Sequence, residues 1–211
     1  MNISTLREWV TDKERFLSID DYLEFGNAFL TYRAESGLQA ELVAQNSPQY
    51  RFFQFNSEAD FQLTRPINTN LFYSLEDFEA ATNHFIEALE SVRDSEFVPE
   101  EKHRNALNRV IYTAQQSIGA TLDALPASRS NTARKLNGQF FERFIGLAIN
   151  RAGIACRSGN HSVPVKDDQG NTQFEMRYQH DLMVEVEGDI KAIGSVKTSS
   201  KDRIDKVFID K

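Results

Sequence analysis

Asp181 and Lys197 are the two residues whose types and spacing best suit chemistry. They belong to two segments, 181–187 and 190–197, in which apolar and polar residues alternate as they do in half-buried strands. A carboxylate is a hard oxygen ligand for Mg²⁺, a bound metal polarises a phosphate and acidifies a water, and an ammonium offsets developing negative charge. The pair therefore predicts metal-dependent hydrolysis of phosphodiesters, although a hairpin also uses such residues for an ordinary surface salt bridge.

The pairing of these two strands decides whether Asp181 and Lys197 meet. Each strand has one apolar face, and the two apolar faces lie on the same side only if even-numbered residues pair with even-numbered residues. This requirement predicts an odd loop, which we place at residues 188–190 with a bulge. With that loop, Asp181 lies opposite Lys197 and Glu187 lies opposite Lys191.

Glu142 is a third candidate because of the glycines around it. Gly138 stands four residues before it and Gly146 four residues after it, so all three stack on one face of a helix. The absence of side chains on both sides leaves room for a strand or a DNA backbone to approach the carboxylate. A solvated glutamate with incidental glycines is the alternative interpretation.

The segment after Lys197 is predicted to be the start of a helix, near Ser199 or Ser200. Lys201, Asp202 and Arg203 then fall in the first turn, where basic residues oppose the helix dipole. Lys and Arg can donate to guanine in the major groove, and Asp can accept from cytosine. The triplet therefore indicates base contacts, with a solvated polar helix start as the alternative.

The charge of the chain is unevenly distributed. Residues 1–128 hold 10 Lys and Arg against 20 Asp and Glu, whereas residues 129–211 hold 14 against 11. The change falls at a short break with turn character that begins at Pro126. Any polyanionic partner is therefore expected to meet the second part.

The elements that must position these residues follow from periodicity and turn signals. The first part reads as mostly helical, with an aromatic-rich stretch that could hold one or two strands. The second part reads as helix, several strands and a final helix, which is an α/β arrangement. The predicted helices are 5–16, 19–34, one opening at Ser74, one opening at Pro99 and 130–152; the aromatic-rich stretch is 50–73; the strands are 154–157, 172–178, 181–187 and 190–197, with turns at 158–160, 167–170 and 188–189.

Other classes of protein are excluded by what the chain lacks. The single cysteine, Cys156, excludes a disulfide framework and a cysteine zinc site and favours a reducing, cytoplasmic compartment. No apolar stretch approaches the length that spans a bilayer, and the first residues do not resemble a secretory signal. The four histidines have no metal-ligand spacing, and the chain has neither a phosphate-binding glycine loop nor a serine nucleophile elbow.

The candidate residues together resemble the PD-(D/E)XK restriction endonucleases, and among them the subgroup typified by EcoRII, PspGI and NgoMIV. The resemblance covers about residues 134–211 and rests on Gly138-x-x-x-Glu142, on Asp181, and on the run from Ser195 to Arg203. Ser195 stands where most of the superfamily has a second acid. His180 stands where the family name expects proline.

The resemblance implies a type II restriction endonuclease that requires Mg²⁺. It implies that Glu142, Asp181 and a displaced acid on the last helix, Asp210, bind the metal, and that Lys197 assists the water. The Lys201-Asp202-Arg203 triplet corresponds to the readers of CC/GG base pairs. The implied reaction is cleavage of double-stranded DNA by a homodimer at a palindromic CCGG or CCNGG site, in a system with a cognate methyltransferase.

The implied fold is a restriction-endonuclease-like mixed sheet flanked by helices, within an overall α/β (α+β) class. Residues 129–211 would form the nuclease core, and the mainly helical residues 1–128 would frame the DNA or dimerise. Because the family fold continues past the equivalent of Lys211, we expect the chain to be a fragment or truncated. A non-specific or junction-resolving repair nuclease of the same fold, and an inactive DNA-binding module, remain as alternatives.

Overall fold

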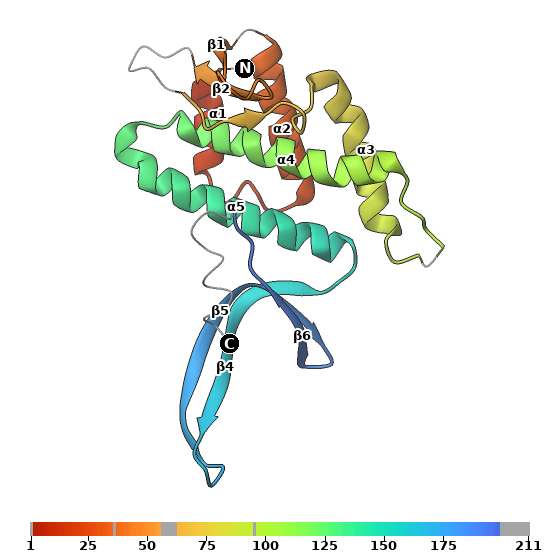
Figure 1. The fold of residues 1–211 in the computed structure, drawn as a ribbon, viewed down its shortest axis with the longest axis vertical. Helices are drawn as coiled ribbons and strands as arrows, with labels where there is room; N and C mark the ends of the chain where they lie inside the picture. The colour runs from red at the N-terminus through yellow and green to blue at the C-terminus, as the bar shows by residue number, and fades with distance from the viewer. Residues whose placement is uncertain (1, 36, 56–62, 95, 199–211) are drawn as a thin grey trace. The chain divides into compact units, whose positions relative to one another are not determined.

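The computed structural model describes residues 2–35, 37–55, 63–94 and 96–198 and has a mixed α and β fold (Figure 1). The described part contains five α-helices and two three-stranded antiparallel sheets, which confirms the predicted fold class. The mixed sheet expected from the family resemblance stays a prediction. No helix in the described ranges combines the length and the apolar character needed to cross a membrane.

The chain divides into two compact units, residues 1–140 and 141–211. This division falls inside a helix, twelve residues beyond the domain boundary that we place at residue 128 from the change in charge.

The helices of the first unit begin where the sequence supplies caps. Ser18 accepts a hydrogen bond from the Asp21 N–H, and Ser74 accepts one from the Asp77 N–H. The segment predicted as a helix over 5–16 ends five residues early, because the backbone of Asp12 is extended. The helices are α1 (Ile3–Thr11), α2 (Ile19–Ala34), α3 (Leu75–Ser91), α4 (Glu101–Asp123), the short 3₁₀ helix Ala127–Arg129, and α5 (Ser130–Arg151), whose second half belongs to the second unit.

The first sheet confirms the strands expected in the aromatic-rich stretch. It contains β1 (Leu38–Val43), β2 (Tyr50–Phe55) and β3 (Ile67–Asn68), in that order. The strand β1 was not predicted, because its short segment has no clear alternation and most of its side chains are exposed or half-buried.

The second sheet contains β4 (Cys156–Lys166), β5 (Thr172–Val186) and β6 (Asp189–Gly194), in that order. The turn predicted at 158–160 is wrong, because those residues lie within β4, where the pairing with β5 is irregular between Arg157 and Gly159. The segments predicted as two strands, 172–178 and 181–187, form the single long strand β5. The turn at 167–170 is present, with Gly170 at a positive φ of 86°.

The turn between β5 and β6 differs from the predicted one in length but preserves its parity. Glu187 and Gly188 have φ values of 55° and 87°, which suits a two-residue hairpin turn. A bulge at Lys191 adds one residue to β6, so beyond the bulge Leu182 pairs with Gly194 and even-numbered residues face even-numbered ones, as predicted. The register is therefore shifted by two positions, and Lys191 bonds Asp189 instead of lying opposite Glu187.

Candidate functional site

Three donors from one short segment converge on the carboxylate of Asp181. The Lys197 ammonium lies 2.5 Å from Oδ2, the Val196 N–H donates to the same oxygen at 2.8 Å, and the Ser195 hydroxyl donates to it at 3.0 Å. Among the described residues, every hydrogen bond to Asp181 reaches Oδ2. This arrangement fixes the orientation of the carboxylate, and no described residue donates a hydrogen bond to Oδ1.

The hairpin explains why these groups meet. Asp181 lies on β5 one residue before the Leu182–Gly194 pair, and the chain that leaves β6 at Gly194 continues directly past it. The predicted adjacency of Asp181 and Lys197 is thus observed, although the register differs. The buried Val196 side chain anchors the segment 195–197, whereas the Lys197 side chain is a third exposed and can reach a substrate.

The pKa of Asp181 lies below its ordinary value. Burial by itself would raise this pKa, because desolvation favours the neutral acid. The hydrogen bonds from Lys197, from the Val196 N–H and from the Ser195 hydroxyl outweigh burial, and the charge of Lys197 lowers the pKa further. Asp181 is therefore held as a carboxylate, which is the form that binds a cation.

This pKa shift predicts a pH-dependent contribution of Asp181 to folding. A carboxyl with a depressed pKa in the folded chain stabilises the fold above its unfolded pKa of about 4, and this stabilisation is lost as the pH falls through the folded pKa. In urea unfolding, the difference in free energy between the wild type and Asp181→Asn should therefore shrink as the pH is lowered below about 4. A difference that stays constant between neutral and strongly acidic pH would contradict this assignment.

The structure places Glu142 on the helix that packs against β5. Gly146, one turn further along α5, has space for a Cβ only 3.7 Å from the Leu182 side chain, so it faces the strand as predicted. Gly138 has open space around the position of a Cβ. Glu142 is half-buried, and because it stands four residues before Gly146 it lies on the same side of α5. Its role as a metal ligand stays a prediction.

Four predicted site residues lie outside the described residues. They are the base-reading candidates Lys201, Asp202 and Arg203 and the metal-ligand candidate Asp210. The helix predicted to begin near Ser199 or Ser200 lies there too.

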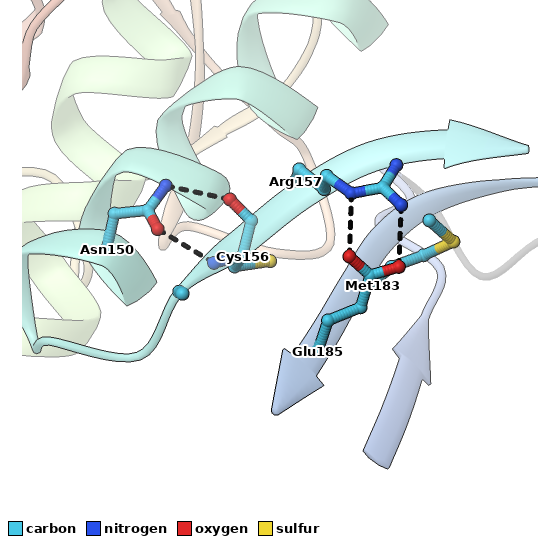
Figure 2. Close-up of a pocket in the computed structure, with 6 residues that line it drawn as sticks. Asn150, Cys156, Arg157, Met183 and Glu185 are labelled. Atoms are coloured by element: carbon cyan, nitrogen blue, oxygen red, sulfur yellow. Dashed lines mark hydrogen bonds and ion pairs between the residues drawn. The ribbon is translucent and has the colours of Figure 1, made fainter. Parts of the chain in front are cut away.

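A pocket of about 260 Å³ lies between the end of α5 and the strands β4 and β5 (Figure 2). Met183 and Glu185 line it from β5, and Arg157 reaches Glu185 with two hydrogen bonds of 2.6 and 3.1 Å. Asn150 bridges both backbone groups of Cys156 at 2.8 and 2.9 Å and so joins the end of α5 to the start of β4. Sequence reasoning missed these contacts, because nothing in the spacing of Arg157 or Asn150 reveals their partners.

A second cluster of potential ligands lies in the first unit, on α3 and α4. The ligand atoms of His84, Glu87 and His103 lie within 4.8 Å of one another. The buried His103 Nδ1 accepts a hydrogen bond of 3.0 Å from the Glu100 N–H, which places the proton of the neutral ring on Nε2. Nε2 lies 3.2 Å from the Glu87 carboxylate, at an angle outside the usual hydrogen-bond range. A metal bound to Nε2 would leave the ring proton on Nδ1, and Nδ1 could then no longer accept the hydrogen bond from the Glu100 N–H. We therefore interpret His103 as a structural contact between α3 and α4.

This interpretation predicts that a transition metal does not stabilise the fold through the cluster of His84, Glu87 and His103. An equimolar amount of Zn²⁺ should leave the thermal unfolding midpoint unchanged, whereas His103→Gln should lower that midpoint without any metal, because the Glu100 cap and the Glu87 contact are lost. A Zn²⁺-dependent rise in the midpoint that disappears in His103→Gln would show that the cluster is a metal site.

The residues around Asp181 suit a different ion. Mg²⁺ prefers hard oxygen ligands, and the Asp181 carboxylate is a ligand of this kind; a shared site for Mg²⁺ with Glu142 stays a prediction.

Comparisons of the chain with protein-family models, with curated proteins and with solved structures find no match. The resemblance to the PD-(D/E)XK nucleases therefore stays a prediction from the motif residues.

Proposed function

We propose that this chain is an Mg²⁺-dependent endodeoxyribonuclease of the type II restriction class. Its substrate is duplex DNA with a palindromic CCGG or CCNGG site, and its setting is the reducing cytoplasm of a cell whose own DNA a cognate methyltransferase protects. The observation that carries the proposal is the convergence of Ser195, Val196 and Lys197 on one oxygen of Asp181.

The contacts of Asp181 support different roles for its two carboxylate oxygens, with Oδ2 bound within the protein and Oδ1 as the metal ligand. Oδ2 is held by three donors, so the carboxylate does not turn, and Oδ1 with Glu142 would hold the metal. Mg²⁺ bound there would polarise the scissile phosphate and lower the pKa of an attacking water. Lys197 places a positive charge beside the same site, where it stabilises the negative charge that develops on the phosphate as water attacks.

The charge distribution supports DNA as the polyanion. The second part of the chain carries a small positive excess, whereas residues 1–128 carry twice as many acids as bases. A phosphate backbone is therefore attracted to the part that holds Asp181 and Lys197 and repelled by much of the rest.

Digestion of a supercoiled plasmid in the presence of Mg²⁺ tests the proposal directly. Discrete fragments whose ends map to CCGG or CCNGG sites support it, and EDTA should abolish them. Smeared products would indicate a non-specific or junction-resolving nuclease. Retained DNA binding without any cleavage would indicate a DNA-binding module that lacks the chemistry.

Base recognition gives a separate prediction. Arg203 stands six residues after Lys197, a tether short enough to keep a base contact in register with the cut phosphate. Arg203→Ala should lower the preference for a CCGG or CCNGG duplex over a scrambled duplex by about 10- to 100-fold, since a bidentate base contact discriminates by about 1–3 kcal/mol. Binding of both duplexes is compared at one salt concentration. An equal loss on both duplexes would make Arg203 a backbone contact.

A further inference from the structure

The long hairpin of β4 and β5 carries an apolar stripe on one face. Side chains opposite each other in a hairpin lie on the same face, and three consecutive facing pairs are apolar or aromatic. Polar pairs, such as Ser162 with Arg177, occupy the opposite face. We call the first set the ribbon stripe; its pairs are His161 with Tyr178, Val163 with Met176, and Val165 with Phe174.

The ribbon stripe is open to solvent although it continues a buried face. The β4–β5 pairing is irregular between Arg157 and Gly159, and beyond this irregularity the side of the ribbon that carries the stripe continues through the facing pair of Arg157 and Met183, of which Met183 is 1% exposed. Toward the hairpin turn this burial ends, and Val163, Met176 and Phe174 are 40%, 41% and 57% exposed. A two-stranded ribbon is marginally stable unless its apolar face packs against something, and exposed apolar patches of this kind mark interaction sites.

The charge of the ribbon argues against DNA as the partner of this stripe. Residues 156–186 hold three basic and five acidic residues. A β-ribbon that enters a groove of DNA needs positive charge to meet the phosphates. The stripe itself holds no formally charged residue, so two copies can face each other without bringing like charges together.

We propose that the ribbon stripe is the surface through which two copies of this chain associate, with the Val163–Met176 pair at the two-fold axis. This inference rests on the proposed function, because cutting both strands of a palindromic site requires two Asp181–Lys197 centres. The pairing is isologous: the middle pair faces itself, and His161 and Tyr178 of one copy face Val165 and Phe174 of the other.

The size of the stripe sets the expected strength of the dimer. Its exposed side chains add up to a few hundred Å² per copy, which is below the roughly 800 Å² per partner of a standard stable interface. The dimer is therefore weak, and its fraction rises with protein concentration.

Sedimentation equilibrium over a range of concentrations, without DNA or Mg²⁺, tests the proposal independently of nuclease activity. The wild type should show a monomer–dimer equilibrium. Val163→Asp should weaken it by 100-fold or more, whereas Ser162→Asp, on the neighbouring position of the opposite face, should leave it unchanged. Far-UV circular dichroism checks that both variants fold.

Cross-linking provides a second measurement that does not depend on a disruptive charge. In a Cys156→Ser background, Met176→Cys of the two copies should be joined by a bismaleimide cross-linker of about 10 Å, the spacing of packed sheets, and Arg177→Cys, which points to the other face, should not. A wild type that stays monomeric at all concentrations, or a dimer that Val163→Asp leaves intact, would overturn the proposal. So would Val163→Asp if it reduced DNA binding with no change in oligomeric state. If the dimer is confirmed and plasmid cleavage is absent, the interface stands and the proposed nuclease function fails.

Discussion

Lys197→Met is expected to lower the rate of DNA cleavage by about 100- to 1,000-fold, the usual cost of removing one group that stabilises charge in a transition state. Methionine is one atom shorter than lysine, keeps an unbranched side chain and removes the ammonium, so the hairpin should retain its packing. Affinity for a cognate duplex should fall little, because Lys197 acts at the cut phosphate and not on base edges. Single-turnover cleavage and a binding assay in Ca²⁺ separate the two effects.

Asp181→Asn should show the same loss by a different route, since an amide is a poorer ligand for Mg²⁺ than a carboxylate. Lys191→Met is the matched control: Lys191 lies on β6 of the same hairpin, and its 3.0 Å ion pair with Asp189 is exposed on both sides. Exposed ion pairs of this kind contribute little, so Lys191→Met should cleave normally. Near-normal cleavage by Lys197→Met or Asp181→Asn would remove these two residues from the catalytic site and reduce their contact to a structural salt bridge.

The parts of the fold that the sequence predicts well are those set by local chemistry. Ser74 and Asp77 determine where α3 begins, since the hydroxyl and the carboxylate satisfy backbone groups within the same turn. The parity of the β5–β6 pairing was also predictable, because an error of one residue would turn an apolar face to solvent.

The register of that hairpin shows where sequence reasoning ends. A shift of two residues leaves every side chain on its own face, so the hydrophobic pattern cannot detect it. The backbone conformation at the turn sets the register. Glu187 and Gly188 both adopt a positive φ and form a two-residue turn, and Lys191 forms a bulge in β6.

The candidate site was predictable in its side chains but not in its backbone. Asp181, Ser195 and Lys197 share a face by alternation, and that pattern is visible in the sequence. The Val196 N–H, which donates to Asp181 at 2.8 Å, has no signature there, because every residue except proline carries such a group. Only the path of the chain after Gly194 brings it to the carboxylate.

The stability of the first unit is expected to depend most strongly on Phe16, which lies between α1 and α2. Its ring is fully buried and lies 4.5, 5.0 and 5.6 Å, centre to centre, from those of Phe140, Tyr22 and Phe25. Tyr22 also donates a hydrogen bond of 2.9 Å to the Phe140 carbonyl. One ring therefore joins α2 to the first half of α5.

Phe16→Ala should lower the free energy of unfolding by about 3–5 kcal/mol, because it removes buried area and leaves a cavity that the surrounding rings cannot fill. Leu17→Ala is the control at the next position: Leu17 is 58% exposed, and a surface truncation of this kind changes stability by less than about 0.5 kcal/mol. Urea unfolding followed by circular dichroism measures both. A loss below about 1 kcal/mol for Phe16→Ala, or equal losses for the two variants, would mean that Phe16 is not a central core residue of this unit.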